Sequence, residues 1–407
     1  MVEALQVRVY THFDTLGCLL PAWEELLSEF PNASVFCTPE WLGPWWRAFG
    51  AGLEPRIIGF FDTTQRLVAL APLTLGTVDA LGGLKLRVLR LMGDGSGDSD
   101  NLDLPVRSGY EEAFVRGFLD WLDAHAQLWD ICELNTLPAN SPAGNRLQDY
   151  LKRWNWDTFH SQRPRSVVPL PHSWESYLGQ LSTEDRHNLV RYQRRLERRY
   201  RVRIYKCTKE TQLSAGLEAL FRLHQERWKV RGEPGTFCSE ARRRFYGEMS
   251  RLLLARERLE FWFLDLDGET VAAQFALRYE DAVFQLQEGF DPKHRSDKIG
   301  YLLRGHVLKQ LVGEGVRCYD FLGGQSPHKA RWGSQVGNYM NVCLARRNSL
   351  GALYARGEHH LSEGKELLRA HLPRRAWRML HWANLRLNPE PTLGVSKRFT
   401  SRVSSRL

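Results

Sequence analysis

The stretch Glu260-Phe-Trp-Phe-Leu-Asp-Leu266 opens the part of the chain that decides the fold. The pair Asp267-Gly268 follows it and favours the positive φ angles of a two-residue hairpin turn. Two further apolar runs cover residues 270–279 and 282–288, separated by Glu280-Asp281. Aromatic and aliphatic runs bounded by turn residues are typical of strands, so this stretch predicts three consecutive antiparallel strands.

A polar loop and a helix follow this meander. The loop runs from Gly289 to Lys298, residues 299–312 have helical spacing, and residues 316–322 return as a strand. Backbone N–H groups at a helix start have no intrahelical partner and attract anions. We therefore expect an anion-binding site where the loop meets the helix.

The length of 407 residues predicts two domains. The first half repeats the order of helices, an antiparallel meander, a helix, a strand and a helix, with Leu102-Asp-Leu104 as a candidate fourth strand. We predict an α/β (α+β) fold with two similar domains, each a mixed, mostly antiparallel central sheet flanked by helices. The predicted segments are an N-terminal domain (1–170) and a basic linker helix with a first strand (171–209). They are followed by a C-terminal domain closed by a strand over 339–346 (210–350) and a helical tail with a disordered end (351–407).

The net charge of +9 is concentrated in two segments. Residues 184–209 hold ten basic and three acidic residues, and residues 351–407 hold eleven basic and four acidic ones. Residues 184–209 are either a solvated helix between the domains or a surface for an anionic partner such as RNA, a nucleotide-sugar or an anionic lipid, and residues 351–407 could meet such a partner too. Residues 353–387 in particular predict a basic amphipathic helix that lies on a membrane face or packs on its own domain.

Other classes of protein are excluded by the sequence pattern. The seven cysteines form no C-x-x-C pair and no zinc-ligand set, so we expect no metal. No signal-peptide pattern or 18-residue apolar run is present, which predicts a cytoplasmic protein, free or at the inner face of the membrane, without a transmembrane segment. No G-x-S-x-G motif or reactive cysteine setting indicates a covalent intermediate.

Four stretches resemble motifs of the CelD-like acetyltransferases, a GNAT-fold group related to the FemAB peptidyltransferases. They are Asn188–Leu196, Leu223–Trp228 with Gly232–Phe237, Ser296–Leu303, and Tyr319–Gly324 with Lys329–Trp332. The resemblance implies tandem GNAT-like domains, of which the first is degenerate because its Gly93–Asp100 loop is too acidic for a pyrophosphate. It also implies acetyl-CoA or another acyl-CoA as co-substrate.

The resemblance places three groups of site residues. The cofactor would lie against the loop and helix start, at Phe290, Arg295, Ser296, Lys298, Ile299, Gly300 and Tyr301. The catalytic candidates are Glu288, which is otherwise a solvent-facing strand end, and Asp320, which is otherwise a buried structural hydrogen-bonding group. The acceptor would meet His224, Trp228, Arg231, Lys329, Arg331 and Trp332, whose alternative roles are core packing and pinning of the last strand.

Three functions follow as hypotheses. The first is an acyl-CoA-dependent N- or O-acyltransferase, in which an amine or hydroxyl of a small-molecule or saccharide acceptor attacks the thioester directly. The resemblance implies a sugar, a nucleotide-sugar or an envelope or exopolysaccharide precursor as that acceptor. The second is a FemAB-like aminoacyl-tRNA-dependent peptidyltransferase, and the third is a non-catalytic protein that binds RNA or a membrane surface on a decayed GNAT scaffold.

Overall fold

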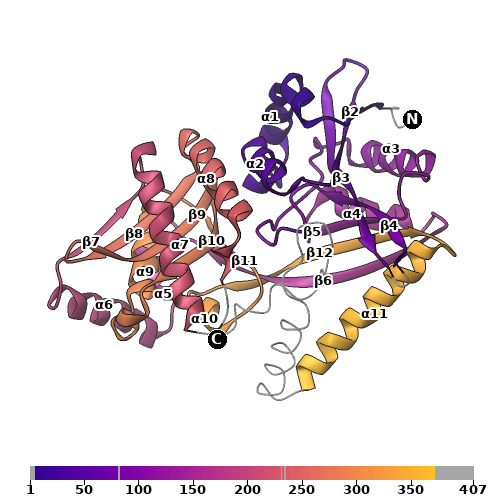
Figure 1. Cartoon of the computed structure of the whole chain (residues 1–407). Helices are drawn as coiled ribbons and strands as arrows, with labels where there is room; N and C mark the ends of the chain where they lie inside the picture. Colours follow the sequence, from indigo (N-terminus) through magenta and orange to yellow (C-terminus); the bar gives the residue numbers. More distant parts are fainter. Residues whose placement is uncertain (1–4, 81–82, 231, 233–234, 372–407) are drawn as a thin grey trace. The chain divides into compact units, whose positions relative to one another are not determined.

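The computed structural model describes residues 5–80, 83–230, 232 and 235–371, and the chain divides into two units. Among the described residues, unit 1 comprises those up to Leu42, Phe49–Arg163 and Asn338–His371. Unit 2 comprises Gly43–Ala48 and Pro164–Gly337. Both units contain a mixed, mostly antiparallel sheet with helices (Figure 1), which confirms the predicted fold class.

The strands of unit 1 follow the order β1-β2-β3-β4-β5-β12. Their bounds are β1 Gln6–Tyr10, β2 Glu54–Phe61, β3 Leu67–Asp79, β4 Lys85–Leu91, β5 Ile131–Pro138 and β12 Gln335–Arg346. The helices are α1 Leu20–Glu29, α3 Glu111–Ala124, α4 Pro142–Leu151 and α11 Leu350–His371. Helix α2, Pro39–Phe49, contains the segment Gly43–Ala48 that is assigned to unit 2. Helix α3 packs on β2 through its Phe114 ring, which meets the edge of Phe60 at a centroid distance of 4.9 Å.

The loop after β4 is folded into unit 1. Asp94 accepts a hydrogen bond from the Asn135 side chain of β5 at 2.9 Å, and the Asn101 side chain donates to the hydroxyl of Tyr339 in β12 at 3.1 Å. Asp103 is 2% exposed and accepts from the Ser141 hydroxyl at 2.6 Å. Burial raises the pKa of the Asp103 carboxyl to about 7, against hydrogen bonds that lower it.

The strands of unit 2 follow the order β6-β11-β10-β9-β8-β7. Their bounds are β6 Trp156–Pro169, β7 Val202–Lys206, β8 Leu259–Leu266, β9 Glu269–Tyr279, β10 Ala282–Phe290 and β11 Cys318–Gly323. The helices are α5 Trp174–Gln180, α6 Thr183–Glu197, α7 Leu213–Lys229, α8 Glu240–Ala255, α9 Ile299–Gly313 and the short α10 Pro327–Ala330. The predicted meander, helix and returning strand are confirmed, and both turn residues have positive φ, 52° at Asp267 and 93° at Gly268.

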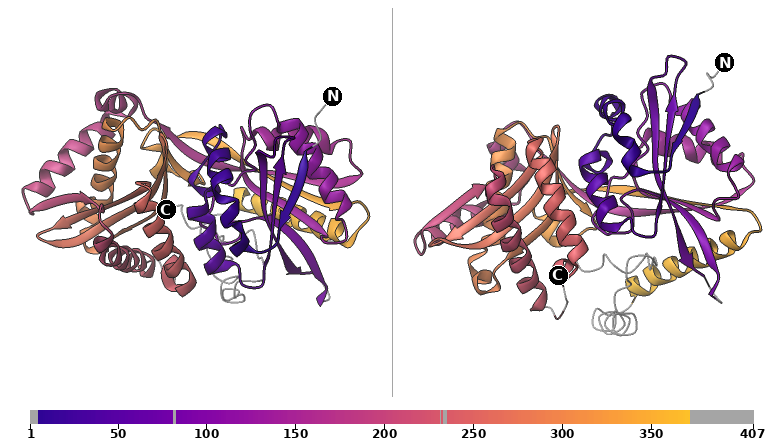
Figure 2. Two further views of the ribbon diagram at one scale, coloured as in Figure 1. Left: turned by 90° about the horizontal axis from the view of Figure 1, so that it is seen from above. Right: turned by 45° about the horizontal axis from the view of Figure 1, so that its top comes forward.

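Alternating side chains of β8 pack into the apolar layers on the two faces of the unit 2 sheet. Phe261 and Phe263 face α7, where a Cβ on Gly216 would lie 2.6 Å from the Phe263 ring. Trp262 and Leu264 belong instead to the apolar cluster that α9 and the preceding helices α5 and α6 complete. Helices α7 and α8 therefore cover one face of the sheet, and α9, α5 and α6 cover the other (Figures 1 and 2).

Two details of the sequence expectation differ from the structure. Leu102–Leu104 forms no strand, and the nearby backbone pairing is the isolated bridge between Ala69 and Val106. The strand expected at 339–346 exists as β12 and pairs antiparallel with β5, a partner that the sequence pattern did not predict. The part of the predicted tail that the structure describes is α11, and residues 372–387 of the predicted basic helix lie outside the described residues.

Candidate active site

The backbone opens between two parallel strands of unit 2. Strands β10 and β11 pair only from Ala282 with Cys318 to Phe284 with Asp320. Strand β10 continues to Phe290, and its register against β9 shifts between Gln285 and Gln287. Such a bulge leaves a backbone group without its ladder partner and bends the strand. The two strands therefore part beside the bulge, and side chains occupy the space that strand pairing leaves.

A charged network lies at this opening. Glu288 of β10 accepts a hydrogen bond from Nη1 of Arg227 in α7 at 3.0 Å, through its Oε1. Its Oε2 accepts from Nη2 of Arg304 in α9. The side chains of Glu288 and Arg227 are each 21% exposed, and that of Arg304 is 1% exposed. One carboxylate thus joins helices on the two faces of the sheet.

Arg304 also spans the two strands that part. On the β10 side its Nη2 donates to the Gln285 side chain at 3.0 Å. On the β11 side its guanidinium lies 5.0 Å from the centroid of the Phe321 ring and 5.9 Å from that of Trp332. Its Nη1 lies 3.3 Å from Nε2 of His328 in α10. The guanidinium therefore contacts side chains of both strands where their backbones stop pairing.

The electrostatics of the network hold Glu288 ionised. Burial raises the pKa of Glu288, but the charges of Arg304 and Arg227 outweigh it and bring the pKa well below the usual range of a glutamate. Burial lowers the pKa of Arg304, yet the Glu288 charge leaves it raised above the usual value. Burial and the Arg304 charge lower the pKa of His328 to about 4, so this histidine is neutral at pH 7.

The predicted cofactor loop leads directly into α9. Pro292–Asp297 forms a 3-10 helix, and Lys298 takes a left-handed conformation with φ of 59° before α9 begins at Ile299. Gly300 lies beside the Phe290 ring, since a Cβ there would be 3.5 Å from it. Phe290 in turn lies under the Arg227 guanidinium at 5.0 Å, so the loop end and the charged network are contiguous.

Asp297 in this loop draws in basic residues from the preceding helix region. Its side chain is 4% exposed and pairs with Arg199 at 2.6 Å, Arg195 at 3.5 Å and His294 at 3.2 Å. Arg195 also donates to the carbonyl oxygen of Ser296. The acidic residue of the loop is thereby neutralised, while Arg295, Ser296 and Lys298 stay exposed.

The predicted acceptor residues have different surroundings. His224 is 2% exposed and accepts a hydrogen bond from the Trp228 indole at 2.8 Å. Burial, followed by the Arg227 charge, lowers its pKa to about 3, so the ring is neutral. His224 is therefore a buried packing residue beside the network, while Trp228 is half-buried and Arg231 lies outside the described residues.

Lys329 is turned into the protein. Its Nζ donates to the carbonyl oxygens of Phe321, Leu322, Gly323 and Gly324 at 2.9, 3.3, 2.8 and 3.1 Å. These bonds use the three donors of an ammonium group on the end of β11 and the loop behind it. Lys329 therefore fixes the end of β11 and the loop behind it.

The remaining predicted residues divide between core and surface. Trp332 is fully buried, with its ring 4.6 Å from that of Tyr301. Arg331 is exposed and lies 3.8 Å from Asp185. Asp320 is 1% exposed, accepts from the backbone N–H of Leu322 at 2.7 Å and lies 3.6 Å from Arg165. Asp320 thus supports the backbone irregularity at the end of β11, where Leu322 has φ of 59°.

Sequence reasoning missed the two arginines that hold Glu288. A signal for Arg304 existed, because it is a charge within the apolar helical run 299–312 and a buried charge requires a partner. Arg227 had no such signal, since it lies among polar residues near the end of α7.

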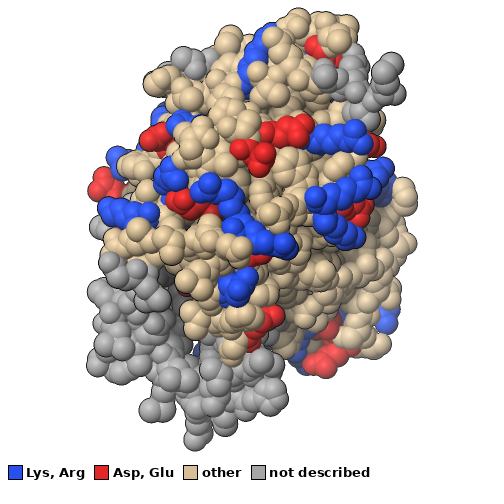
Figure 3. Space-filling model, turned by 90° about the vertical axis from the view of Figure 1, so that its right-hand side faces the viewer, with Lys and Arg blue, Asp and Glu red and all other residues tan. Residues whose placement is uncertain are grey.

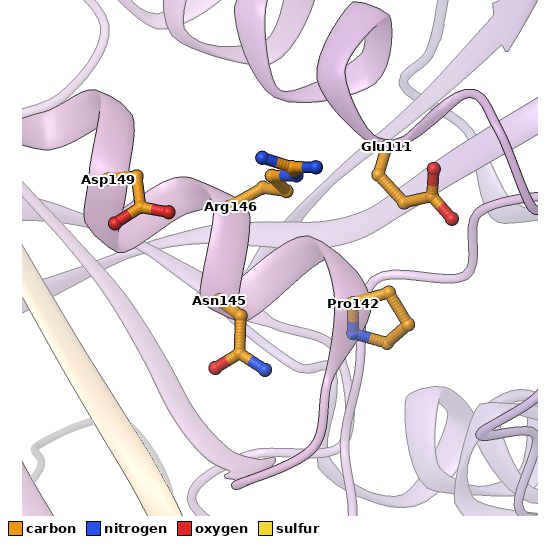
Figure 4. Close-up of a pocket in the computed structure, with 5 residues that line it drawn as sticks. All are labelled: Glu111, Pro142, Asn145, Arg146 and Asp149. Atoms are coloured by element: carbon orange, nitrogen blue, oxygen red, sulfur yellow. The ribbon is translucent and has the colours of Figure 1, made fainter.

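Unit 1 also carries a surface depression. A depression of about 380 Å³ in unit 1 lies between the start of α3 and α4 (Figure 4) and is lined by Glu111, Pro142, Asn145, Arg146 and Asp149. It contains none of the predicted site residues. On the face drawn in Figure 3, basic and acidic side chains are interspersed. Within the described ranges there is no cluster of His, Cys, Asp or Glu that could hold a metal ion, and no helix long and apolar enough to cross a membrane.

Comparisons with known proteins agree with this geometry. Residues 184–330, which contain the network and the loop, match the family model of the acetyltransferase (GNAT) domain. No curated protein sequence matches the chain.

Solved structures of other proteins share the fold. The crystal structure of FemX is 11% identical, with 82% of this chain and 96% of that chain covered and a TM-score of 0.58. A conserved protein of unknown function from Bacteroides thetaiotaomicron is 11% identical, with 84% and 100% covered and a TM-score of 0.51. At this identity the likeness establishes a common fold.

Proposed function

We propose that the chain is an acyl-CoA-dependent acyltransferase whose acyl donor enters between β10 and β11, since residues 184–330 match the family model of the acetyltransferase (GNAT) domain. The observation that carries this proposal is the parting of the two strands after Phe284 and Asp320, directly beside the start of α9. A thioester lying along the unpaired half of β10 has free backbone to bind.

The start of α9 would hold the pyrophosphate of the donor. The N–H groups of Ile299 and Gly300 belong to the first turn, where the helix dipole favours an anion. Arg295 and Lys298 are exposed beside them and would add charge. With Asp297 already neutralised by two arginines, its carboxylate does not oppose a bound phosphate.

The reaction would proceed by direct attack of an amine or hydroxyl on the thioester. A backbone N–H at the bulge of β10 would polarise the thioester carbonyl, as an oxyanion hole does. Glu288 binds protons too weakly for an efficient base, so we assign it the task of holding Arg227 and Arg304 in place. Positioning of donor and acceptor then supplies most of the rate enhancement.

The acceptor we propose is a sugar, a nucleotide-sugar or an envelope polysaccharide precursor. The support is the sequence resemblance to the CelD-like group, together with the GNAT domain that contains most of those motifs. Exposed Arg331 and half-buried Trp228 are the predicted acceptor residues that remain available at the surface.

A FemAB-like donor is the second candidate, and one observation favours it. The left-handed residue before α9 is Lys298, not the glycine usual in GNAT pyrophosphate loops, and the arginines Arg195 and Arg199 adjoin the loop. An aminoacyl-tRNA would meet that basic surface through its phosphates.

The test is calorimetric titration of the full chain with acetyl-CoA and CoA. We expect micromolar binding that the variant Arg295→Glu/Lys298→Glu abolishes. The matched control Lys309→Glu/Lys209→Glu reverses two exposed charges of unit 2 away from the start of α9 and is expected to bind as the wild type does. Absence of binding to the wild type would overturn the acyl-CoA proposal and leave the aminoacyl-tRNA donor as the one to titrate next.

A further inference from the structure

A row of arginines lies on the side of α6 that meets the predicted cofactor loop. Arg191 and Arg195 are one helical turn apart in α6, and Arg199 lies in the turn directly after the helix. All three side chains, here called the arginine ridge, are exposed. They are not among the predicted site residues, and they are separate from the two arginines that hold Glu288.

The arginine ridge contacts the loop that leads into α9. Nη1 of Arg199 pairs with Oδ1 of Asp297 at 2.6 Å, and Nη2 of Arg195 donates to the carbonyl oxygen of Ser296. These two loop residues precede the start of α9 at Ile299 by two and three positions. The ridge therefore lies beside the place where the proposed function puts the pyrophosphate of the donor.

Tyrosines fix the ridge against the first turn of α9. The guanidinium groups of Arg191 and Arg195 lie 5.0 and 5.7 Å from the centroid of the Tyr192 ring. That ring meets Tyr301 of α9 edge to face, at a centroid distance of 6.2 Å, and the Tyr301 hydroxyl donates to the carbonyl oxygen of Asp185 in α6 at 3.1 Å. The ridge is thus held in place relative to the helix start.

Most donors of the arginine ridge are available to a ligand. The side chains of Arg195 and Arg199 are 45% and 51% exposed. Within the described part of the chain, the Nε–H groups of the three arginines donate to no protein acceptor. Asp297 is shared by Arg195 and Arg199, so its single negative charge leaves the ridge with a net positive charge.

The acidic side chains of α6 itself lie away from the ridge. Glu197 follows Arg195 by two positions, which is a rotation of about 200° around the helix. Glu184 lies about 10 Å before the ridge along the helix axis, at 1.5 Å per residue. Asp185 is buried and lies 3.8 Å from Arg331. The positive charge of the ridge is therefore not cancelled by its own helix.

A phosphate monoester is the anion that suits this ridge. Such a group carries a charge of about −1.5 to −2 at pH 7, and guanidinium groups bind its oxygens through paired hydrogen bonds. Coenzyme A carries a phosphate monoester at the 3′ position of its ribose, in addition to its pyrophosphate. Because the start of α9, with Arg295 and Lys298, is assigned to the pyrophosphate, the ridge is left for this second phosphate.

We propose that the arginine ridge binds the 3′-phosphate of the donor and makes the chain selective for coenzyme A thioesters over donors that lack this phosphate. This inference rests on the proposed function and adds to it the group by which the donor is recognised. A phosphodiester backbone such as that of RNA carries one charge per phosphate, and it is the alternative that the test separates.

The test is calorimetric titration of the full chain with CoA and with 3′-dephospho-CoA in the same buffer. We expect CoA to bind about ten- to hundredfold more tightly, which is the effect of one or two hydrogen bonds to a charged group. In the variant Arg191→Gln/Arg195→Gln/Arg199→Gln this preference should disappear. Because the readout is the ratio of two affinities, a general disturbance of the loop, which weakens both ligands, leaves the ratio unchanged.

Two further variants serve as controls for this ratio. Arg191→Gln alone leaves both arginine contacts of Asp297 intact and should lower the preference for CoA several-fold. The variant Arg203→Gln/Lys209→Gln/Lys309→Gln removes three exposed charges elsewhere in unit 2 and should keep the wild-type preference. Loss of the preference in this second control would show a general charge effect and would overturn the assignment to the ridge.

The outcomes separate this inference from the proposed function. Equal affinity of the wild type for CoA and 3′-dephospho-CoA overturns the inference and leaves acyl-CoA as the donor. A preference that the triple ridge variant retains also overturns it. Absence of binding by either ligand overturns both, and salt-sensitive binding of an RNA that the triple variant loses would then assign the ridge to a nucleic acid.

Discussion

Replacing Arg304 by methionine tests the charged network most directly. The variant removes the donors to Glu288 and Gln285 and the charge beneath Phe321 while keeping a similar side-chain length. Removing one partner of a buried ion pair costs about 3–5 kcal/mol. Because Glu288 keeps its ion pair with Arg227 and is 21% exposed, we expect a loss of unfolding free energy near the lower end of this range, about 3 kcal/mol.

A double-mutant cycle separates the ion pair from the packing. We expect Glu288→Gln alone to cost about 2–3 kcal/mol, and the double variant to cost about 1–3 kcal/mol less than the sum, because the two side chains share one interaction. The assay is urea denaturation of the full chain, monitored by tryptophan fluorescence. Because the two units need not unfold together, the variants are compared by the unfolding transition that the substitution shifts. Additive costs would refute the reasoning and reduce Arg304 to a packing residue.

The pH dependence of the cycle has a definite sign. The folded pKa of Glu288 lies below its unfolded value, so its stabilisation is present above the unfolded pKa of about 4.3 and is lost as the pH falls toward the folded pKa. The stability difference between wild type and Glu288→Gln should therefore be constant near neutral pH and shrink below about pH 4. A difference that grows on acidification would contradict the assignment.

Three other predictions concern single side chains. Asp103→Asn should raise the free energy of unfolding by about 2–4 kcal/mol above pH 7 and change it little below pH 4. The reason is that the raised folded pKa of Asp103 makes the wild type less stable as the pH rises to about 7. Urea denaturation of both proteins at the two pH values measures this difference. Lys329→Met should lower the free energy of unfolding, measured by urea denaturation, by about 2–4 kcal/mol, because four carbonyl groups lose their donor. The control Arg331→Met changes an exposed side chain and should alter stability by less than about 0.5 kcal/mol. Gly289→Ala should lower the free energy of unfolding by about 1–3 kcal/mol and weaken acetyl-CoA binding, since its Cβ would lie 2.7 Å from the backbone nitrogen of His224. In the control Gly313→Ala the new Cβ meets nothing within 4 Å, and an equal loss in this control would contradict the prediction.

The local pattern of unit 2 was predictable, and its site only partly. The turn Asp267-Gly268 and the apolar runs around it specify the meander through neighbouring residues, so the strands and α9 were found within a few positions. The partners of Glu288 come from α7 and α9, which lie apart in the sequence, and a pattern of single residues does not report such meetings.

One residue and one strand show what a local pattern leaves out. Lys329 was predicted to meet the acceptor, and its sequence neighbours gave no sign that its ammonium binds the carbonyl groups at the end of β11. The partner of β12 was missed for a different reason. Its apolar pattern predicts a strand, but its partner β5 lies about 200 residues earlier in the sequence, and a local pattern does not identify so distant a partner.

The pairing of β12 with β5 also has a consequence for synthesis on the ribosome. Strand β5 is translated about 200 residues before its antiparallel partner. At roughly 5–20 residues per second, one edge of β5 waits on the order of 10–40 s for that partner. Exposed edges invite pairing with other chains. A nascent chain stalled before Asn338 would therefore carry an incomplete first unit, in which chaperones would have to cover the exposed edge of β5.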